Sequence, residues 1–224
     1  MSAEKPVKTI KVWDAGIRLF HWALVILFCL SAYSAFQDKF GIYADMHLNA
    51  GVATLMLVIW RIVWGLVGSD TARFSQFVKS PIAGFAHMKQ MLSGLPYKTI
   101  GHNPLGGLSV VLMLVLLLAQ AVMGLFASDG MIFSGPLFKE VTGSMSSELT
   151  EWHALLGRIL IGVAAFHVLV VLAYGVLKRI NLVWPMISGK VNAELSASAP
   201  TIKPGWLALL LFIAVGAAVC LSVF

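Results

Sequence analysis

The segment WHALLGRILIGVAAFH, residues 152–167, sets two histidines 14 positions apart in an apolar run. Fourteen residues make just under four helical turns, so His153 and His167 leave the same side of a helix, about 21 Å apart along its axis. That separation covers most of the roughly 30 Å of hydrocarbon in a bilayer. One helix can therefore present a nitrogen ligand near each face of a membrane.

The composition of the chain points to a membrane protein. Hydrophobic residues make up 59% of the 224 residues and charged residues only 12%, whereas soluble domains are about a quarter charged. An outer-membrane barrel would alternate apolar and polar residues, but this chain has long unbroken apolar runs. These features predict an all-α integral membrane protein built as a helix bundle.

Five apolar runs are long enough to span a membrane, and we expect them to form a single membrane domain. The first four make a helix bundle, and the fifth is a C-terminal helix with no ionisable side chain other than a cysteine. An amphipathic stretch is expected on the inner surface, and a flexible linker before the last span. The spans are residues 19–36, 47–67, 105–128, 152–177 and 206–224, the amphipathic stretch is 77–92, and the linker is 190–204.

The distribution of charge predicts the orientation. Twelve of the 16 Lys and Arg residues lie in three segments, residues 1–18, 68–104 and 178–204. The positive-inside rule places these segments, and the N-terminus, in the cytoplasm, and the C-terminus outside. We therefore expect a multi-pass membrane protein in contact with lipid. Because the net charge of +6 belongs to the inner loops, it implies no nucleic-acid partner.

Two further histidines, His21 and His47, begin the first and second apolar runs. With the N-terminus inside, His21 lies near the inner face and His47 near the outer face. His153 opens the fourth span at the outer face, and His167 lies toward the inner side. Depth therefore pairs His21 with His167 and His47 with His153.

Two imidazoles at each depth suit a haem better than a bare metal ion. Zinc and copper sites take three or four protein ligands, whereas a porphyrin supplies four nitrogens and leaves two axial positions. The cysteines, Cys29 and Cys220, form no C-x-x-C-H motif, which excludes c-type attachment. We therefore expect two haems, neither of c type, which makes the first four spans a haem-binding bundle. The alternative, a transporter or metal channel that uses the histidines as a relay, would normally show inverted repeats, and we find none.

Several short motifs occur along nearly the whole chain. They are Val12-Trp13-Asp14, Arg18-Leu19-Phe20-His21-Trp22, His47 with Gly51, Arg61-Ile62-Val63-Trp64-Gly65-Leu66-Val67-Gly68, Ala72-Arg73-Phe74, Gly101-His102-Asn103-Pro104-Leu105-Gly106-Gly107, and the His153/His167 pair. Together these motifs resemble the bacterial cytochrome b561 family, which includes the di-haem cytochrome b subunits of nickel-iron hydrogenases. The resemblance implies two b haems with the same ligand pairs and a place in the bacterial inner membrane. It also implies electron exchange between membrane quinone and a partner or small molecule outside.

Three arginines in or beside the spans are candidate partners of haem propionates. Arg61 would serve the inner haem, or its long side chain reaches the headgroups instead. Arg158 would serve the outer haem, because an unpaired charge within the membrane is costly. Arg18, one turn before His21, is either a propionate partner or ordinary inner-side charge.

His102 and Asn103 lie at the inner mouth of the third span and could donate hydrogen bonds to a quinone headgroup. The simpler interpretation is that Asn103 caps a helix that Pro104 begins.

These features predict a di-haem membrane cytochrome that carries electrons between ubiquinone or menaquinone and a periplasmic partner, such as a cytochrome c or a dehydrogenase or hydrogenase subunit. Two alternatives stay open at this point. The chain could oxidise superoxide and reduce quinone without a partner, or it could be a passive haem-containing anchor for a periplasmic oxidoreductase.

Overall fold

The structure is a computed structural model that describes residues 7–37, 40–92 and 101–224. The chain divides into two compact units. The first unit comprises Met1–Leu19, Val63–Leu112 and Val170–Leu209, and the second comprises Phe20–Ile62, Met113–Leu169 and Leu210–Phe224. The boundaries cut across long helices, so each of these helices contributes a segment to both units.

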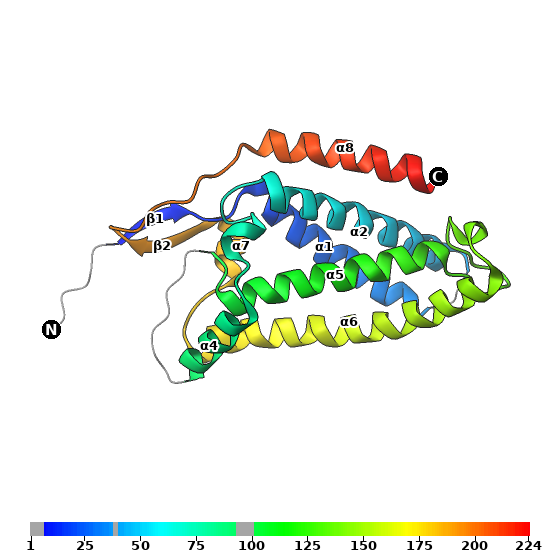
Figure 1. Ribbon diagram of the computed structural model, residues 1–224, viewed down its shortest axis with the longest axis horizontal. Helices are drawn as coiled ribbons and strands as arrows, with labels where there is room; N and C mark the ends of the chain where they lie inside the picture. The colour runs from blue at the N-terminus through cyan, green and yellow to red at the C-terminus, as the bar shows by residue number, and fades with distance from the viewer. Residues whose placement is uncertain (1–6, 38–39, 93–100) are drawn as a thin grey trace. The chain divides into compact units, whose positions relative to one another are not determined.

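Among the described residues, five helices are long and apolar enough to cross a membrane (Figure 1). An α-helix satisfies its backbone polar groups within the segment, as a lipid environment requires. The result confirms the prediction of an all-α integral membrane protein with a fifth, C-terminal span. The helices are α1 (Ala15–Ala35), α2 (Ile42–Val67), α5 (Pro104–Phe126), α6 (Gly143–Leu177) and α8 (Gly205–Val223).

Helix α6 begins well before the predicted span at Trp152. The Thr142 hydroxyl accepts a hydrogen bond from the Met145 N–H at 3.3 Å and caps the first turn. At 35 residues, α6 is about 52 Å long, which exceeds the roughly 30 Å of hydrocarbon. Hydropathy marks only the apolar part of such a helix, so the polar first turns escape prediction.

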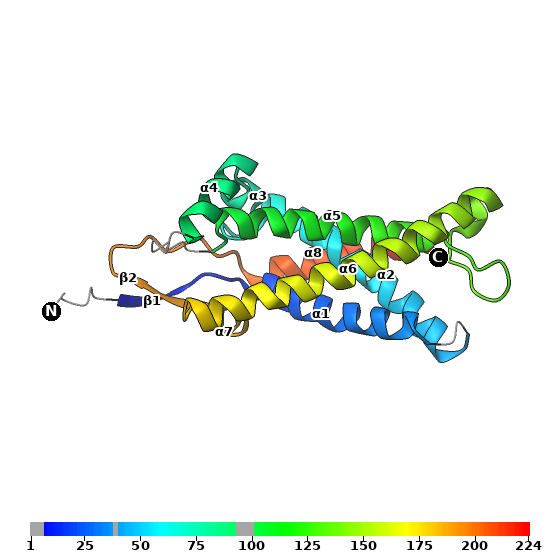
Figure 2. The ribbon, with the colours of Figure 1, turned by 90° about the horizontal axis from the view of Figure 1, so that it is seen from below.

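In the second unit, segments of α1, α2, α5 and α6 lie side by side (Figures 1 and 2). Helix α2 supplies more buried side chains to this unit than any other helix, with Val58 fully buried and Trp60 nearly so. The Trp60 ring stacks on Phe20 of α1 with ring centres 5.8 Å apart. Large apolar side chains elsewhere on the helices stay exposed, as expected of surfaces that face lipid.

The first unit contains an antiparallel strand pair that the sequence analysis did not predict. Strand β1 (Val7–Lys11) pairs with β2 (Lys190–Glu194) over five residues (Figure 1). Gly189, between α7 (Val183–Ser188) and β2, adopts a left-handed conformation with φ of +78°. Its carbonyl accepts the Val12 N–H at 2.8 Å, which joins the end of β1 to the start of β2.

Residues 198–203 bind the turn after α2, and we call them the strap. The Thr201 N–H donates to the Asp70 carboxylate at 2.7 Å, and the Lys203 N–H donates to Ser69 Oγ at 3.0 Å. The Thr201 N–H, together with Arg73, lowers the pKa of Asp70, so this attachment weakens only when the pH falls through that lowered value. The expectation of a flexible linker over 190–204 is therefore wrong. Residues 190–194 form β2, and side chains in the turn after α2 accept hydrogen bonds from backbone N–H groups of the strap.

Two short helices occupy the region where one amphipathic stretch was predicted. Helix α3 (Phe74–Phe77) ends before α4 (Pro81–Leu92) begins, and a proline fits the first position of a helix because its missing N–H is not needed there. That α4 rests on the inner membrane surface stays a prediction, as does the description of the chain as one domain.

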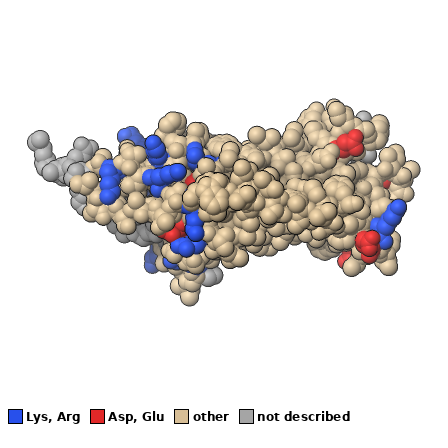
Figure 3. All heavy atoms as spheres, turned by 90° about the horizontal axis from the view of Figure 1, so that it is seen from above, with Lys and Arg blue, Asp and Glu red and all other residues tan. Residues whose placement is uncertain are grey.

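The predicted cytoplasmic segments gather in the first unit. The residue ranges of this unit contain 12 of the 16 Lys and Arg residues of the chain. Figure 3 shows such side chains closely grouped on the face in view. One unit thus collects the three basic segments that the positive-inside rule places on the same side.

Asp14 connects the start of α1 to α2 within the first unit. Its Oδ1 accepts the Ile17 N–H at 2.8 Å, and its Oδ2 accepts the Trp64 indole N–H at 3.1 Å. The Asp14 side chain is buried, with 1% of its surface exposed. The aspartate of the Val12-Trp13-Asp14 motif is therefore a helix cap and an indole acceptor.

Replacing Asp14 with alanine should lower the free energy of unfolding by about 2.5–4 kcal/mol. Loss of a helix cap costs about 1 kcal/mol, and loss of a hydrogen bond to a charged acceptor costs about 1.5–3 kcal/mol. Thermal unfolding in detergent would measure the change, with Glu148→Ala on the exposed part of α6 as the control. Equal midpoints for Asp14→Ala and Glu148→Ala would contradict this role.

Candidate haem-binding site

His47 on α2 and His153 on α6 face each other in the second unit. Their ring centres are 5.9 Å apart, and the ring planes cross at 83°. An imidazole nitrogen binds a transition metal at about 2.0 Å, so two axial imidazoles on one iron hold their ring centres about 6 Å apart. The spacing of this pair therefore fits one iron between the two rings.

Hydrogen bonds fix the tautomer of each of these imidazoles. His47 Nδ1 lies 3.0 Å from the Ser31 carbonyl oxygen, and His153 Nδ1 lies 2.9 Å from the Gln120 carbonyl oxygen. A carbonyl oxygen only accepts, so each Nδ1 carries the proton and each Nε2 keeps its lone pair. Both side chains are thus prepared to bind iron through Nε2.

Ser34 of α1 adds a second acceptor for His47. Its hydroxyl lies 3.1 Å from His47 Nδ1 and donates to the Leu30 carbonyl at 2.8 Å. Because its hydrogen is used in the helix, the Ser34 oxygen is free to accept the Nδ1 proton.

Gly124 of α5 makes room for the His153 ring. A Cβ at this position would lie 2.9 Å from His153 Cε1, closer than real Cβ atoms approach. Gln120 lies one turn earlier on the same helix, so the missing side chain of Gly124 opens the Gln120 carbonyl to the imidazole. The Gln120 side-chain nitrogen also lies 3.2 Å from His153 Nε2.

His21 on α1 and His167 on α6 lie close enough for their charges to interact. The His21 ring also contacts Trp22 edge-on, with ring centres 5.0 Å apart. His21 Nδ1 is buried and has no hydrogen-bond partner among the described residues. The structure therefore brings together the same two pairs that depth predicted, and their role as iron ligands stays a prediction.

The three candidate arginines differ in their surroundings. Arg61 of α2 is buried, with 3% of its surface exposed. Arg158 is exposed on α6. The Arg18 guanidinium donates to the Ile187 carbonyl at the end of α7, a partner that the sequence did not suggest. Pairing of any of the three with a propionate stays a prediction.

Asn103 acts as the cap of α5, as the simpler interpretation held. Its Oδ1 accepts the Gly106 N–H at 2.7 Å. Its side-chain nitrogen donates to the Tyr174 hydroxyl at 3.3 Å. The amide is therefore already engaged at both ends.

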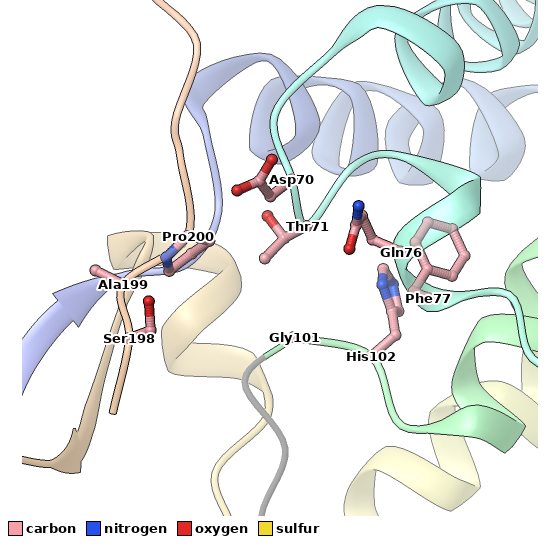
Figure 4. A pocket seen from close by; sticks show the side chains of 9 residues that line it. All are labelled: Asp70, Thr71, Gln76, Phe77, Gly101, His102, Ser198, Ala199 and Pro200. Atoms are coloured by element: carbon pink, nitrogen blue, oxygen red, sulfur yellow. The ribbon is translucent and has the colours of Figure 1, made fainter. Parts of the chain in front are cut away.

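His102 lines a cavity of about 290 Å³ in the first unit (Figure 4). The His102 ring packs against Trp13 and Phe77, with ring centres 4.7 and 4.5 Å away. Asp70 and Gln76 add polar atoms to the cavity wall. The cavity is large enough for a small polar ring and offers it an aromatic wall and hydrogen-bonding groups.

The donor set fits a haem rather than a metal ion held by the protein alone. Among the described residues, no three or more His, Cys, Asp or Glu side chains gather in a group that could hold a metal ion. A pair of imidazoles leaves four positions of an iron to another ligand, which a porphyrin fills. The Nδ1 bonds and the 5.9 Å spacing of His47 and His153 agree with that arrangement.

Sequence reasoning missed the residues that position the imidazoles. Ser31, Ser34, Gln120 and Gly124 lie in apolar spans and match no ligand motif. Gln120 gave the clearest available signal, since a carboxamide inside a membrane span is costly and points to a function.

The chain matches the family model for prokaryotic cytochrome b561 over residues 12–189. It is similar to a probable Ni/Fe-hydrogenase B-type cytochrome subunit of Azotobacter chroococcum mcd 1, with 23% identity over 216 residues, 80% of this chain and 87% of that protein. A protein of the same description from Rhizobium leguminosarum bv. viciae is 25% identical over 215 residues, 82% of this chain and 89% of that protein. The chain therefore belongs to the prokaryotic cytochrome b561 family and is a multi-pass b-type cytochrome of the bacterial inner membrane.

Proposed function

We propose that the chain carries electrons across the inner membrane between the quinone pool and a periplasmic redox partner. In this proposal His21 and His167 hold one b haem, and His47 and His153 hold a second. The observation that carries it is the facing His47/His153 pair, 5.9 Å apart, with both Nε2 atoms left unprotonated. Each haem, when bound, would supply one-electron exchange at its iron.

The side chains around the pairs hold and orient rather than react. Backbone carbonyls fix the His47 and His153 rings, and the apolar surfaces of the helices exclude water. Arg61, buried in α2, is assigned to a propionate of the inner haem, since a guanidinium can bind a carboxylate through charge-assisted hydrogen bonds. Arg158 on α6 is assigned to the outer haem in the same way, since a charge in a membrane helix needs a counter-charge.

The similar proteins suggest the class of partner. Both similar proteins are probable Ni/Fe-hydrogenase B-type cytochrome subunits, so a periplasmic hydrogenase subunit is the first partner to test. The basic segments collected in the first unit support a cytoplasmic N-terminus. His47 and His153 would then lie toward the periplasm, where such a partner would dock.

The cavity at His102 is the candidate quinone site. The His102 and Gln76 side chains can hydrogen-bond a quinone oxygen, and Phe77 offers a flat apolar wall. Quinone takes up or releases protons when it changes redox state, and an imidazole is suited to exchange them near neutral pH. Asn103 caps α5, so we assign it no hydrogen bond to quinone.

Absorption spectra and proteoliposomes test the proposal. The purified protein should contain close to two b haems per chain, and proteoliposomes with ubiquinone or menaquinone should exchange electrons with an added periplasmic partner. Fewer than two haems would overturn the di-haem assignment. Quinone reduction by superoxide alone would show that the electron donor is a small molecule rather than a periplasmic protein. If the haems exchange electrons with no donor or acceptor, the chain would be a passive haem-containing anchor.

Replacing His102 with leucine should raise the KM for quinone about tenfold, because a lost hydrogen bond of about 1–1.5 kcal/mol corresponds to roughly that factor. Haem content should stay unchanged, which separates this effect from misfolding. Steady-state quinone reduction with an artificial donor measures KM. An unchanged KM would move the quinone site away from this cavity.

A further inference from the structure

Two lysines of the first unit face each other across the strand pair. Lys11 of β1 is directly opposite Lys190 of β2, and both residues are exposed. Residues directly opposite in an antiparallel pair point to the same face with Cβ atoms about 5 Å apart, and like charges in such a position destabilise the sheet. Both ammonium groups can therefore reach one small anion.

Hydrogen bonds on each side of the lysine pair hold the two strands in this register. The Gly189 carbonyl accepts the Val12 N–H at 2.8 Å and the Trp13 N–H at 3.2 Å, directly beyond the pair. On its other side, Thr9 Oγ1 donates to Asn192 Oδ1 at 2.9 Å, and these two residues share the face of the lysines. The fold thus keeps two like charges together instead of separating them.

The charge of the lysine pair is not balanced within the part of the chain that the structure describes. Neither Lys11 nor Lys190 forms an ion pair with a described residue. The acid on the same face, Glu194, lies four positions along β2 from Lys190, which is about 13 Å at the rise of a strand. Arg18 adds positive charge, because an added Cβ at Gly189 would lie 3.2 Å from Arg18 Nε. A bound anion would relieve this repulsion.

Exposed apolar side chains beside the lysine pair indicate the class of anion. Trp184 and Ile187 of α7 keep 60% and 49% of their surface exposed. The Ser188 hydroxyl joins this helix to β2, since it donates to the Trp184 carbonyl at 2.9 Å and accepts the Lys190 N–H at 3.2 Å. Exposed tryptophan is typical of the headgroup level of a membrane, and Lys11 lies four positions before the spanning helix α1 begins. A lipid with an anionic headgroup can use both the charge and the apolar surface.

We propose that Lys11 and Lys190 bind the phosphate of an anionic phospholipid, with Trp184 and Ile187 against the apolar part of the same lipid. The phosphate replaces the repulsion between two ammonium groups with an attraction of each to one anion, and basic residues near a membrane surface attract such lipids. On the predicted topology the lipid belongs to the cytoplasmic leaflet. Binding there stabilises the strand pair, and it involves none of the proposed haem ligands or quinone-site residues.

Thermal unfolding of the full-length protein in neutral detergent, with and without added lipid, gives the direct test. Phosphatidylglycerol at about five times its Kd should raise the unfolding midpoint by about 2–4 °C, whereas phosphatidylcholine with the same acyl chains should not. The Lys11→Gln/Lys190→Gln variant should show less than half of that shift. An undiminished shift in this variant, or an equal shift with phosphatidylcholine, would overturn the site. An equal shift with inorganic phosphate would overturn the assignment to a lipid.

Lys79→Gln/Lys89→Gln is the matched control, because it removes two exposed lysines from the same unit and changes the net charge equally. This variant should keep the full shift with phosphatidylglycerol. A loss as large as that of the Lys11→Gln/Lys190→Gln variant would mean that the lipid responds to the net charge alone, which contradicts a site at the lysine pair.

Lys190→Glu provides a second readout that needs no added lipid. Opposite charges directly across two strands stabilise the pair, so its midpoint in neutral detergent should rise above that of the wild type by about 1–2 °C. The shift with phosphatidylglycerol should disappear at the same time. A midpoint equal to or below that of the wild type would show that Lys11 and Lys190 do not repel each other, and a retained lipid shift would rule out the site.

Discussion

His167→Ala should leave the purified protein with one of its two b haems. The His21/His167 pair loses a ligand, whereas the His47/His153 pair lies about 21 Å further along α6 and keeps its carbonyl bonds. The pyridine haemochrome spectrum would measure the change as a fall from close to two haems per chain to close to one.

His87→Ala, at a histidine outside the two pairs, is the matched control and should keep both haems. Loss of both haems in His167→Ala with an intact fold would show that the pairs are not independent. Retention of both would show that His167 is not an axial ligand.

His47→Ala should abolish electron transfer between the periplasmic partner and quinone even though one haem remains. The loss should exceed the about 10–100-fold effect typical of losing an outer hydrogen-bond partner, because an axial ligand itself is removed. Stopped-flow reduction of quinone in proteoliposomes would measure the rate.

The control for His47→Ala is Asp45→Ala, half a turn earlier on α2 and exposed. A His47→Ala rate close to that of Asp45→Ala would mean that electrons enter without the His47/His153 level. That result would contradict the two-level arrangement.

The helices and the histidine pairs were predictable because both follow from one-dimensional patterns. Apolar run length gives the spans, and charge bias gives the orientation from which depth pairs His21 with His167 and His47 with His153. Hydropathy failed only at helix ends such as residues 143–151, the polar first turns of α6 that Thr142 caps.

The strand pair, the strap and the positioning residues were not predictable from local sequence. Strand β1 has an alternating pattern too short to distinguish from a loop, and its partner β2 lies beyond four membrane spans. Gly124 resembles any glycine of a membrane helix, and only the approach of His153 from α6 gives it a role. Such features depend on which distant segments meet.

The pairing of Val7 with Glu194 has a consequence for biogenesis. During synthesis β1 is made first, and its partner β2 is made only after α1, α2, α5 and α6. Until then the backbone hydrogen-bonding groups along the edge of β1 have no strand to pair with. Open edges invite wrong partners, and lysine is a residue that proteins use to discourage them; Lys8 and Lys11 flank the central residues of β1. Closure of the first unit is therefore a late step in assembly, and a chain released before residue 190 would lack the strand that completes it.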